Sequence, residues 1–247
     1  MPNSDRKSRN TYIALCLIII LALALRISFF TYKMDHFKLG GDARNYINMS
    51  HQLVDKGIFG YWYEGYSYGG KPGVSNARVT PGYPLFVSAV YAVFHDVYKQ
   101  ITVIRLLQII IGGLITPLLA FGIVRRLFKR EDMALVTALL VSIYPSYILS
   151  VTQILTEVLA LASMLLFFYL TILGLQSKKA YVNLLAGGAF AIQILIRPNI
   201  LPLFVVPFIY AWFTWYRDDR KELVRVFLFN LIGFVILMLP WWVRNYA

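Results

Sequence analysis

Residues 11–30 read TYIALCLIIILALALRISFF and contain a single charged side chain, Arg26. A transmembrane helix needs roughly 20 consecutive, mainly apolar residues, so this stretch predicts a membrane-spanning helix. Basic residues precede it at positions 6, 7 and 9, as they do in a signal peptide. The apolar run is longer than that of a signal peptide, and no A-x-A-like cleavage site follows it. These features favour a retained signal-anchor.

The whole chain has the composition of a membrane protein. It has 247 residues, of which 59% are hydrophobic and 15% are charged, and its mean hydropathy is +0.63. Soluble domains average about 45–50% apolar and about 25% charged residues, and disordered chains have low hydrophobicity. The composition excludes both classes. The one cysteine, Cys16, excludes a disulfide framework and a CxxC motif.

Further apolar runs predict an all-α integral membrane fold, with about seven transmembrane helices in a single module covering residues 1–247. Between residues 180 and 216, Arg197-Pro198-Asn199 interrupts a run long enough for two short helices, because an α-helix rises about 1.5 Å per residue. The predicted spans cover about residues 11–30, 101–124, 134–150, 154–175, 180–196, 199–216 and 226–242.

The formal net charge of +12 indicates how the chain is oriented in the membrane. Of the 24 basic residues, 13 lie in four short segments at alternate span ends. The positive-inside rule places such segments in the cytoplasm, which predicts a multi-pass protein of the cell membrane with a cytoplasmic N-terminus and an outer C-terminus. Membrane lipids, and not nucleic acid, are the expected partners of this charge. The 13 residues are Arg6, Lys7, Arg9, Arg125, Arg126, Lys129, Arg130, Lys178, Lys179, Arg217, Arg220, Lys221 and Arg225.

The predicted outer loop, residues 31–100, is far longer than the other connections, and loops of this length are usually functional. Within it, Asp42 to Val54 has the apolar spacing of a short amphipathic helix, with Gly57 as its C-cap. Pro81 to Phe94 is apolar but short for a span, which indicates an interfacial or re-entrant helix.

Asp42 is the first candidate functional residue, in GGDARNY at residues 40–46. Two glycines and an acid indicate a tight turn that leads into a helix. One interpretation is a helix N-cap, which Asp favours. Another is a carboxylate at the outer membrane surface that accepts a proton from an acceptor hydroxyl or holds a divalent cation. The first role does not exclude the second.

Glu157 is the second candidate, because it lies just inside the outer end of a predicted span. An acid within an apolar run is costly and marks a functional or paired site. The alternative is a structural ion pair with Arg105, Arg26 or Arg197.

Arginines near the outer span ends form a third group of candidates: Arg26, Arg105, Arg197 and Arg244. Snorkelling towards lipid headgroups explains any one of them. Together with Arg78 and Lys71 in the loop, they are also suited to converge on a phosphate, because guanidinium groups match it with a planar fork of donors.

The aromatic stretch IFGYWYEGYSYGG, residues 58–70, has two interpretations: an aromatic belt at the membrane surface or a platform for sugar rings. The three histidines lack metal-ligand spacing. Walker A, GxSxG and HExxH motifs are absent from the sequence, which argues against nucleotide hydrolysis, an α/β-hydrolase, a zincin and a nucleotide cofactor.

Six short motifs in order resemble the N-terminal half of bacterial membrane glycosyltransferases of the GT-C class. The most similar branch is related to protein O-mannosyltransferases and aminoarabinose transferases, and the resemblance covers nearly the whole chain. The motifs are LALRISFF (23–30), GGDARNY (40–46), ARVTPGYPLF (77–86), IYPSYILSVTQILTEVL (143–159), ILIRPNILPL (194–203) and PWWVRNY (240–246).

The resemblance implies an enzyme that moves a sugar from a polyprenyl-phosphate carrier to an acceptor outside the cytoplasm, with inversion at the anomeric carbon. It implies that Asp42 is the general base and that Glu157 binds the acceptor or a metal, so a divalent ion at Asp42 and Glu157 is a candidate cofactor. Arg78 matches the basic position near the donor phosphate, and Arg197 and Arg244 match less specifically. Ala43 replaces a second acid that many relatives carry after the Asp.

Relatives of this kind are usually about twice as long, so the resemblance also predicts a C-terminal half that completes the lipid-carrier pocket. The acceptor class stays open among protein, lipid and wall polymer. The alternatives are a non-enzymatic membrane protein, either a transporter or a scaffold subunit, and an inactive truncation of the enzyme.

Overall fold

The computed structural model describes residues 2–33, 40–62, 71 and 73–246, and every regular element within them is helical. The predicted all-helical fold is thereby confirmed for the described part of the chain. The elements in order are α1 (Pro2–Lys33), α2 (Gly41–Lys56), α3 (Gly82–Phe94), α4 (Val97–Ile110), the π-helix η3 (Ile111–Ile115), α5 (Thr116–Phe128), α6 (Glu131–Ile143), α7 (Pro145–Ser150), α8 (Glu157–Ser177), α9 (Ala180–Ile196), the 3-10 helix η4 (Pro198–Val205), α10 (Val206–Phe213) and α11 (Arg220–Tyr246).

Four helical stretches among the described residues are long and apolar enough to cross a membrane. They are Arg9–Lys33, Val97–Phe128, Glu157–Ser177 and Arg220–Tyr246. The chain is therefore a membrane protein by composition and helix length. Ala180–Ile196 and Pro198–Phe213 are apolar but shorter, so the number of seven spans and their orientation stay predictions.

Proline decides where two predicted spans break. The expected span 134–150 is wrong as a single helix, because α6 ends at Ile143 and α7 begins at Pro145. Tyr144 between them is extended, with φ −64° and ψ 117°, the conformation favoured before proline. The predicted break at Arg197-Pro198 is confirmed, since Arg197 is extended and separates α9 from η4.

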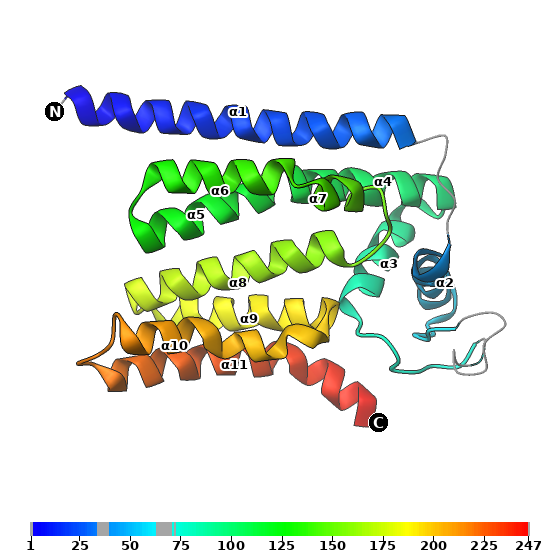
Figure 1. Ribbon diagram of the computed structural model, residues 1–247. Coiled ribbons are helices and arrows are strands. Elements are labelled where there is room, and N and C mark those ends of the chain that lie inside the picture. Colours follow the sequence, from blue (N-terminus) through cyan, green and yellow to red (C-terminus); the bar gives the residue numbers. More distant parts are fainter. Residues whose placement is uncertain (1, 34–39, 63–70, 72, 247) are drawn as a thin grey trace.

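Figure 1 shows the long helices lying side by side, with α2 and α3 packed across one end of the bundle. The turns that follow α5, α8 and α10 lie at the opposite end, near the N-terminus of α1. The predicted amphipathic helix is confirmed as α2, and Gly57 caps it in the left-handed conformation with φ 68°. The two ends of the bundle are therefore chemically different, because one carries Asp42 and the other carries the basic turns.

Two arginines expected at the membrane surface are instead buried inside the bundle. Arg26 has no exposed surface, and its Nη1 donates to the carbonyls of Ala22 at 3.0 Å and Ser142 at 2.9 Å. Arg105 is also buried, and its Nε donates to the Thr152 carbonyl at 2.9 Å. The snorkelling interpretation is therefore wrong for both, since each guanidinium donates to a backbone carbonyl inside the bundle, at Ser142 near the end of α6 or at Thr152 after α7.

Helices α9 and α11 approach closely because glycine removes side chains from their contact. A Cβ placed on Gly187 falls 1.8 Å from the Asn230 carbonyl oxygen, and one on Gly233 falls 2.1 Å from the Leu184 carbonyl oxygen. Small residues allow such backbone contact between membrane helices. The Asn230 amide also donates to the Asn183 Oδ1 at 3.1 Å, within the buried contact. This packing holds α9 in place and thereby positions Arg197 at its end.

Two neighbouring glycines provide a matched test of this contact. Gly187→Ala forces α9 and α11 apart, and overpacking of this kind typically costs about 1–3 kcal/mol. Gly188→Ala is the control, because a Cβ there meets nothing within 4 Å. Alanine is also more favourable than glycine within a helix, by up to about 1 kcal/mol. The Tm of thermal unfolding in detergent is expected to fall for Gly187→Ala and to stay level or rise for Gly188→Ala. Equal effects of the two changes would contradict the close contact.

Candidate functional site at the α2 end of the bundle

Asp42 lies in the first turn of α2 and is exposed. The N-cap position belongs to Gly40, which makes no side-chain capping bond, so the N-cap interpretation of Asp42 is wrong. Its Oδ1 instead accepts a hydrogen bond of 2.8 Å from the Tyr61 hydroxyl. The carboxylate is thus oriented by a residue 19 positions away in the sequence and remains open to solvent.

Tyr61 is held at both its hydroxyl and its backbone. The buried Asn45 amide donates to its hydroxyl at 2.9 Å. The Asn76 side chain accepts from the Tyr61 backbone N–H at 3.1 Å and donates to the Tyr61 carbonyl at 3.0 Å. These contacts fix the phenol from which Asp42 accepts its hydrogen bond.

Asn76 also joins the two described arms of the outer loop. Its backbone N–H donates to the Phe59 carbonyl at 3.0 Å, and its Oδ1 accepts from the Arg78 backbone N–H at 3.3 Å. The arms approach so closely that a Cβ on Gly60 falls 2.3 Å from the Val74 carbonyl oxygen. One asparagine side chain therefore links the segment that orients Asp42 to the segment that carries Arg78.

Contacts between α3 and α9 bring this loop towards Arg197. A Cβ on Gly82 falls 2.7 Å from the backbone of Leu195, and the Thr80 hydroxyl donates to the Ile196 carbonyl at 3.5 Å. The chain that follows Arg78 therefore runs against the end of α9, where Arg197 begins the turn into η4.

Glu157 forms an ion pair with Arg197, at 3.3 Å between the Glu157 Oε1 and the Arg197 Nη1. Of the three arginines considered as partners of Glu157, Arg197 forms the ion pair. The two side chains are 41% and 43% exposed, and pairs open to solvent typically contribute only about 0–1 kcal/mol. The Glu157 Oε2 is buried and accepts no hydrogen bond from the described residues. The pair therefore leaves both groups with capacity for a ligand.

Buried glutamine holds the turn that leads to Glu157. The Gln108 amide donates to the carbonyls of Val151 at 3.0 Å and Gln153 at 2.7 Å. Its Oε1 in turn accepts from the Tyr83 hydroxyl at 3.0 Å. Helices α3 and α4 thereby determine where α8 begins, and Glu157 lies in its first turn, where the helix dipole favours a carboxylate.

Tyr46 lies where the electrostatic influences of these groups meet. Burial raises the pKa of its phenol to about 12, with smaller electrostatic contributions from Asp42, Tyr61 and Glu157 and an opposing one from Arg197. Its ring packs edge-on against Tyr83, with centroids 4.9 Å apart. Tyr46 is therefore a hydrogen-bond donor, and not a base, throughout the physiological pH range.

The four basic residues predicted for a donor phosphate have different surroundings. Arg244 donates to the Phe59 carbonyl at 3.2 Å and to the Ser75 hydroxyl at 2.6 Å, so it holds the loop. Arg197 is shared with Glu157. Arg78 and Lys71 are exposed, and their charged groups have no polar partner among the described residues. These last two cations are available to a ligand.

The donor set does not by itself fit a metal held by the protein. Within the described ranges, no three His, Cys, Asp or Glu side chains are grouped as ligands. Glu157 is engaged by Arg197, and Asp42 by Tyr61. The divalent ion at Asp42 and Glu157 stays a prediction, and the chemistry described below does not depend on it.

Sequence patterns did not point to Asn45, Asn76, Tyr46 or Tyr61 as site residues. Tyr61 lies in the aromatic stretch, for which a membrane belt and a sugar platform were both open interpretations. Tyr63, Tyr66 and Tyr68 of that stretch lie outside the described residues. The sequence feature that could have pointed to this site is the pair of asparagines, Asn45 and Asn76, on either side of the aromatic stretch.

Comparison with known families identifies the family of the chain. A family model described as dolichyl-phosphate-mannose-protein mannosyltransferase matches residues 78–243, well over half of the chain. The chain belongs to this family. The mannosyltransferase family consists of GT-C membrane glycosyltransferases, so the resemblance drawn from the six motifs is confirmed. No curated protein matches the chain.

The family match places part of the site within the shared region. Arg78 begins the match, and Glu157 and Arg197 lie inside it. Asp42 and Lys71 precede it, and Arg244 follows its last residue. The link from Asn76 to both Tyr61 and Arg78 therefore joins the shared mannosyltransferase region to the segment that carries Asp42.

Hydrogen exchange tests that link. Asn76→Ala removes the acceptor of the Tyr61 and Arg78 amides, so exchange at Tyr61 is expected to accelerate about fivefold for each kcal/mol that a hydrogen bond contributes. Asn76→Asp is the control, because it keeps the acceptor oxygen and is expected to retain most of the protection. Mass spectrometry of the exchanged peptides measures both variants. Unchanged exchange in Asn76→Ala would contradict the role of Asn76.

Proposed function

We propose that this protein transfers a sugar, mannose in the first instance, from a polyprenyl-phosphate carrier to an acceptor hydroxyl at the α2 end of the bundle. Membership of the mannosyltransferase family supports the reaction class. The observation that carries the assignment of the site is the exposed Asp42 carboxylate, oriented by Tyr61 and linked through Asn76 to the loop with Arg78.

Asp42 serves as the general base. The Tyr61 hydroxyl occupies Oδ1, and Oδ2 is left to accept the proton of the acceptor hydroxyl as its oxygen attacks the anomeric carbon. A positioned base of this kind typically accelerates a reaction by about 10²–10⁴-fold. Asn45 contributes by holding the phenol of Tyr61, so that the carboxylate keeps one orientation.

The lipid phosphate is the leaving group. As the bond between the acceptor oxygen and the anomeric carbon forms, the bond between that carbon and the phosphate oxygen breaks, and the electron pair leaves with the phosphate. Arg78 and Lys71 are free to stabilise this charge, and Arg197 reaches it by exchanging Glu157 for the phosphate. Direct displacement inverts the configuration of the anomeric carbon.

Glu157 is assigned to the acceptor side of the site. Once Arg197 exchanges Glu157 for the phosphate, the Glu157 side chain can turn and present its buried, unpartnered Oε2 to the acceptor or the sugar, and Tyr46 can donate a hydrogen bond. The proposal includes the predicted orientation, with the N-terminus in the cytoplasm and the reaction outside it, and a C-terminal half as partner in the carrier pocket. Protein, lipid and wall polymer remain the candidate acceptor classes.

Two aspartates on α2 allow a matched activity test. Asp42 and Asp55 each accept a hydrogen bond from a tyrosine hydroxyl, at 2.8 Å from Tyr61 and 3.2 Å from Tyr91. Asp42→Asn removes the base and is expected to lower transfer by about 100-fold or more. Asp55→Asn makes the same chemical change, carboxylate to amide, on the same helix. It is expected to keep transfer near the wild-type level.

The assay uses membranes from cells that express each variant at an equal level. It measures how much radiolabelled mannose these membranes transfer from a polyprenyl-phosphate carrier to an acceptor. Equal transfer by Asp42→Asn and the wild type would remove Asp42 from the mechanism. Transport of a solute by wild-type proteoliposomes, with no sugar transfer by the wild type, would replace the enzyme with the transporter alternative.

A further inference from the structure

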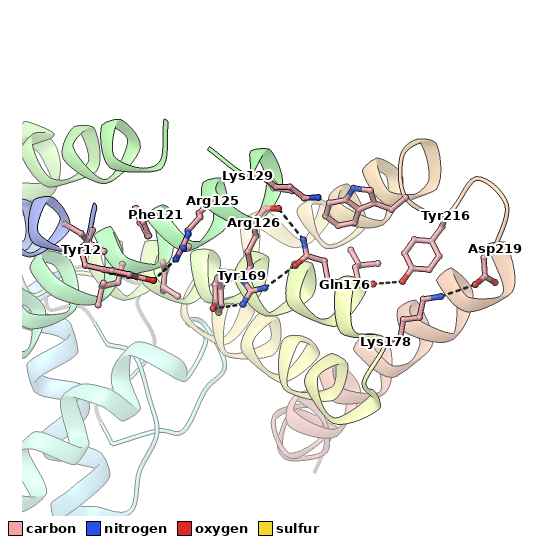
Figure 2. A pocket seen from close by; sticks show the side chains of 17 residues that line it. Tyr12, Phe121, Arg125, Arg126, Lys129, Tyr169, Gln176, Lys178, Tyr216 and Asp219 are labelled. Carbon is pink, nitrogen blue, oxygen red and sulfur yellow. Dashed lines mark hydrogen bonds and ion pairs between the residues drawn. The ribbon is translucent and has the colours of Figure 1, made fainter. Parts of the chain in front are cut away.

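A large cavity lies at the end of the bundle opposite Asp42. Its volume is about 1020 Å³, and α1, α5, α8 and the turn after α10 line it (Figure 2). Four basic side chains face it: Arg125, Arg126, Lys129 and Lys178. Its size is at the upper limit of pockets that take small molecules, about 300–1,000 Å³, so it has room for a headgroup and part of a chain.

Among the described residues, carboxylates pair with two of these four cations. Arg125 pairs with Glu131 at 3.1 Å, and Lys178 pairs with Asp219 at 3.2 Å. Within the part of the chain that the structure describes, the Arg126 guanidinium donates to two neutral groups, at 3.1 Å to Gln176 and 3.4 Å to the Tyr169 hydroxyl, and to no carboxylate. The exposed Lys129 ammonium has no partner within the described ranges. In the described part of the chain, no carboxylate therefore pairs with two of the positive charges in the cavity.

Arg126 is held in place by neutral contacts. Its guanidinium lies 5.2 Å from the centre of the Tyr169 ring, and the Gln176 amide donates back to the Arg126 carbonyl at 3.3 Å. Gly122 leaves space for that ring, because a Cβ there falls 2.8 Å from it. A guanidinium fixed in this way keeps its remaining donors for an anion, and its planar fork suits phosphate.

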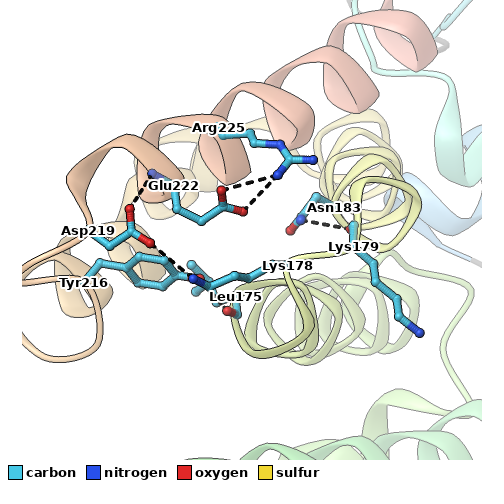
Figure 3. Close-up of polar contacts among 8 residues, drawn as sticks. All are labelled: Leu175, Lys178, Lys179, Asn183, Tyr216, Asp219, Glu222 and Arg225. Atoms are coloured by element: carbon cyan, nitrogen blue, oxygen red, sulfur yellow. Dashed lines mark hydrogen bonds and ion pairs between the residues drawn. The ribbon is translucent and has the colours of Figure 1, made fainter.

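The rim of the cavity is tied together on the α8 side. The Tyr216 hydroxyl donates to the Leu175 carbonyl at 2.5 Å, and Lys178 reaches Asp219 across the same gap (Figure 3). Glu222 is held by Arg225 on α11 at 3.3 Å (Figure 3). Asp219 and Glu222 are thus engaged elsewhere and do not pair with Arg126 or Lys129.

The cavity also has an apolar wall next to its charges. Leu15, Leu118, Leu119, Leu175 and Trp215 line it. A soluble anion needs only the cations, whereas a lipid phosphate needs the cations and an apolar surface for its chains. Basic pockets between membrane helices on the cytoplasmic side are suited to anionic lipid headgroups, and this end carries the basic turns predicted to face the cytoplasm.

We propose that this cavity binds the phosphate headgroup of an anionic membrane lipid, with Arg126 and Lys129 as its principal ligands and the leucine wall against its chains. The site is separate from the sugar-transfer site, because the two lie at opposite ends of the bundle. A lipid bound there would contact α1, α5 and α8 together. At this end the described contacts between α1 and α5 are few, and one of them is the 2.9 Å hydrogen bond from Arg125 to the Tyr12 hydroxyl.

Two double variants with equal charge test the proposal. Arg126→Gln with Lys129→Gln removes both ligands. Arg217→Gln with Lys221→Gln removes one Arg and one Lys at the same end but outside the cavity lining. The full chain is purified in detergent and mixed with dioleoylphosphatidylglycerol or dioleoylphosphatidylcholine, and native mass spectrometry counts the bound lipid.

The wild type is expected to bind phosphatidylglycerol more tightly than phosphatidylcholine. The cavity variant is expected to lose about tenfold in phosphatidylglycerol affinity, the loss of one or two charge-assisted contacts, and the control variant to lose less than about twofold. If the cavity variant fails to fold, Lys129→Gln alone replaces it, because this change breaks no described contact of the side chain. Its affinity for phosphatidylglycerol is expected to fall about threefold.

Three outcomes would overturn the proposal. They are equal affinity for the two lipids, equal losses in the cavity and control variants, and binding of inorganic phosphate by the delipidated chain without any retention of phosphatidylglycerol. The last outcome would assign the cavity to a soluble anion.

Discussion

An apolar bundle tolerates charge mainly at its ends, and this constraint determines where the protein can do chemistry. Inside the bundle, a polar side chain needs a partner from the protein, because lipid provides none. Arg26 and Arg105 meet part of this need, because one nitrogen of each donates to a carbonyl where a helix breaks. Asn183 accepts a hydrogen bond from Asn230. The remaining charges collect at the two ends, where water and headgroups solvate them.

The two ends are built differently from the same helices. At one end, close packing of α9 on α11 and of α3 on α9 places Arg197 beside Glu157, and the outer loop adds Asp42 through Tyr61. Carboxylates and cations alternate there, as group transfer from a phosphate requires. At the other end cations exceed carboxylates, and Arg126 makes only neutral contacts. That composition suits binding an anion.

Local patterns predicted what depends on local physics. Apolar periodicity predicted α2 and its Gly57 cap, and the proline rule predicted the break at Arg197. The same rule, applied at Tyr144 before Pro145, would also have predicted the break between α6 and α7, where the continuous apolar run suggested a single span. Features that depend on contacts between distant segments were missed. Asn76 acts through partners fixed by the folded loop. The burial of Arg26 depends on α6 ending at Ile143, which leaves the Ser142 carbonyl to accept from the guanidinium.

The central claim is that the sugar-phosphate donor binds at the α2 end of the bundle. The most direct test is photo-crosslinking with a polyprenyl-phosphate mannose that carries a diazirine beside its phosphate, followed by peptide mapping. The account predicts labels in residues 71–81 or 197–200, removed by excess unlabelled donor. Competed labels confined to residues 125–129 and 176–178, at the opposite end, would contradict it.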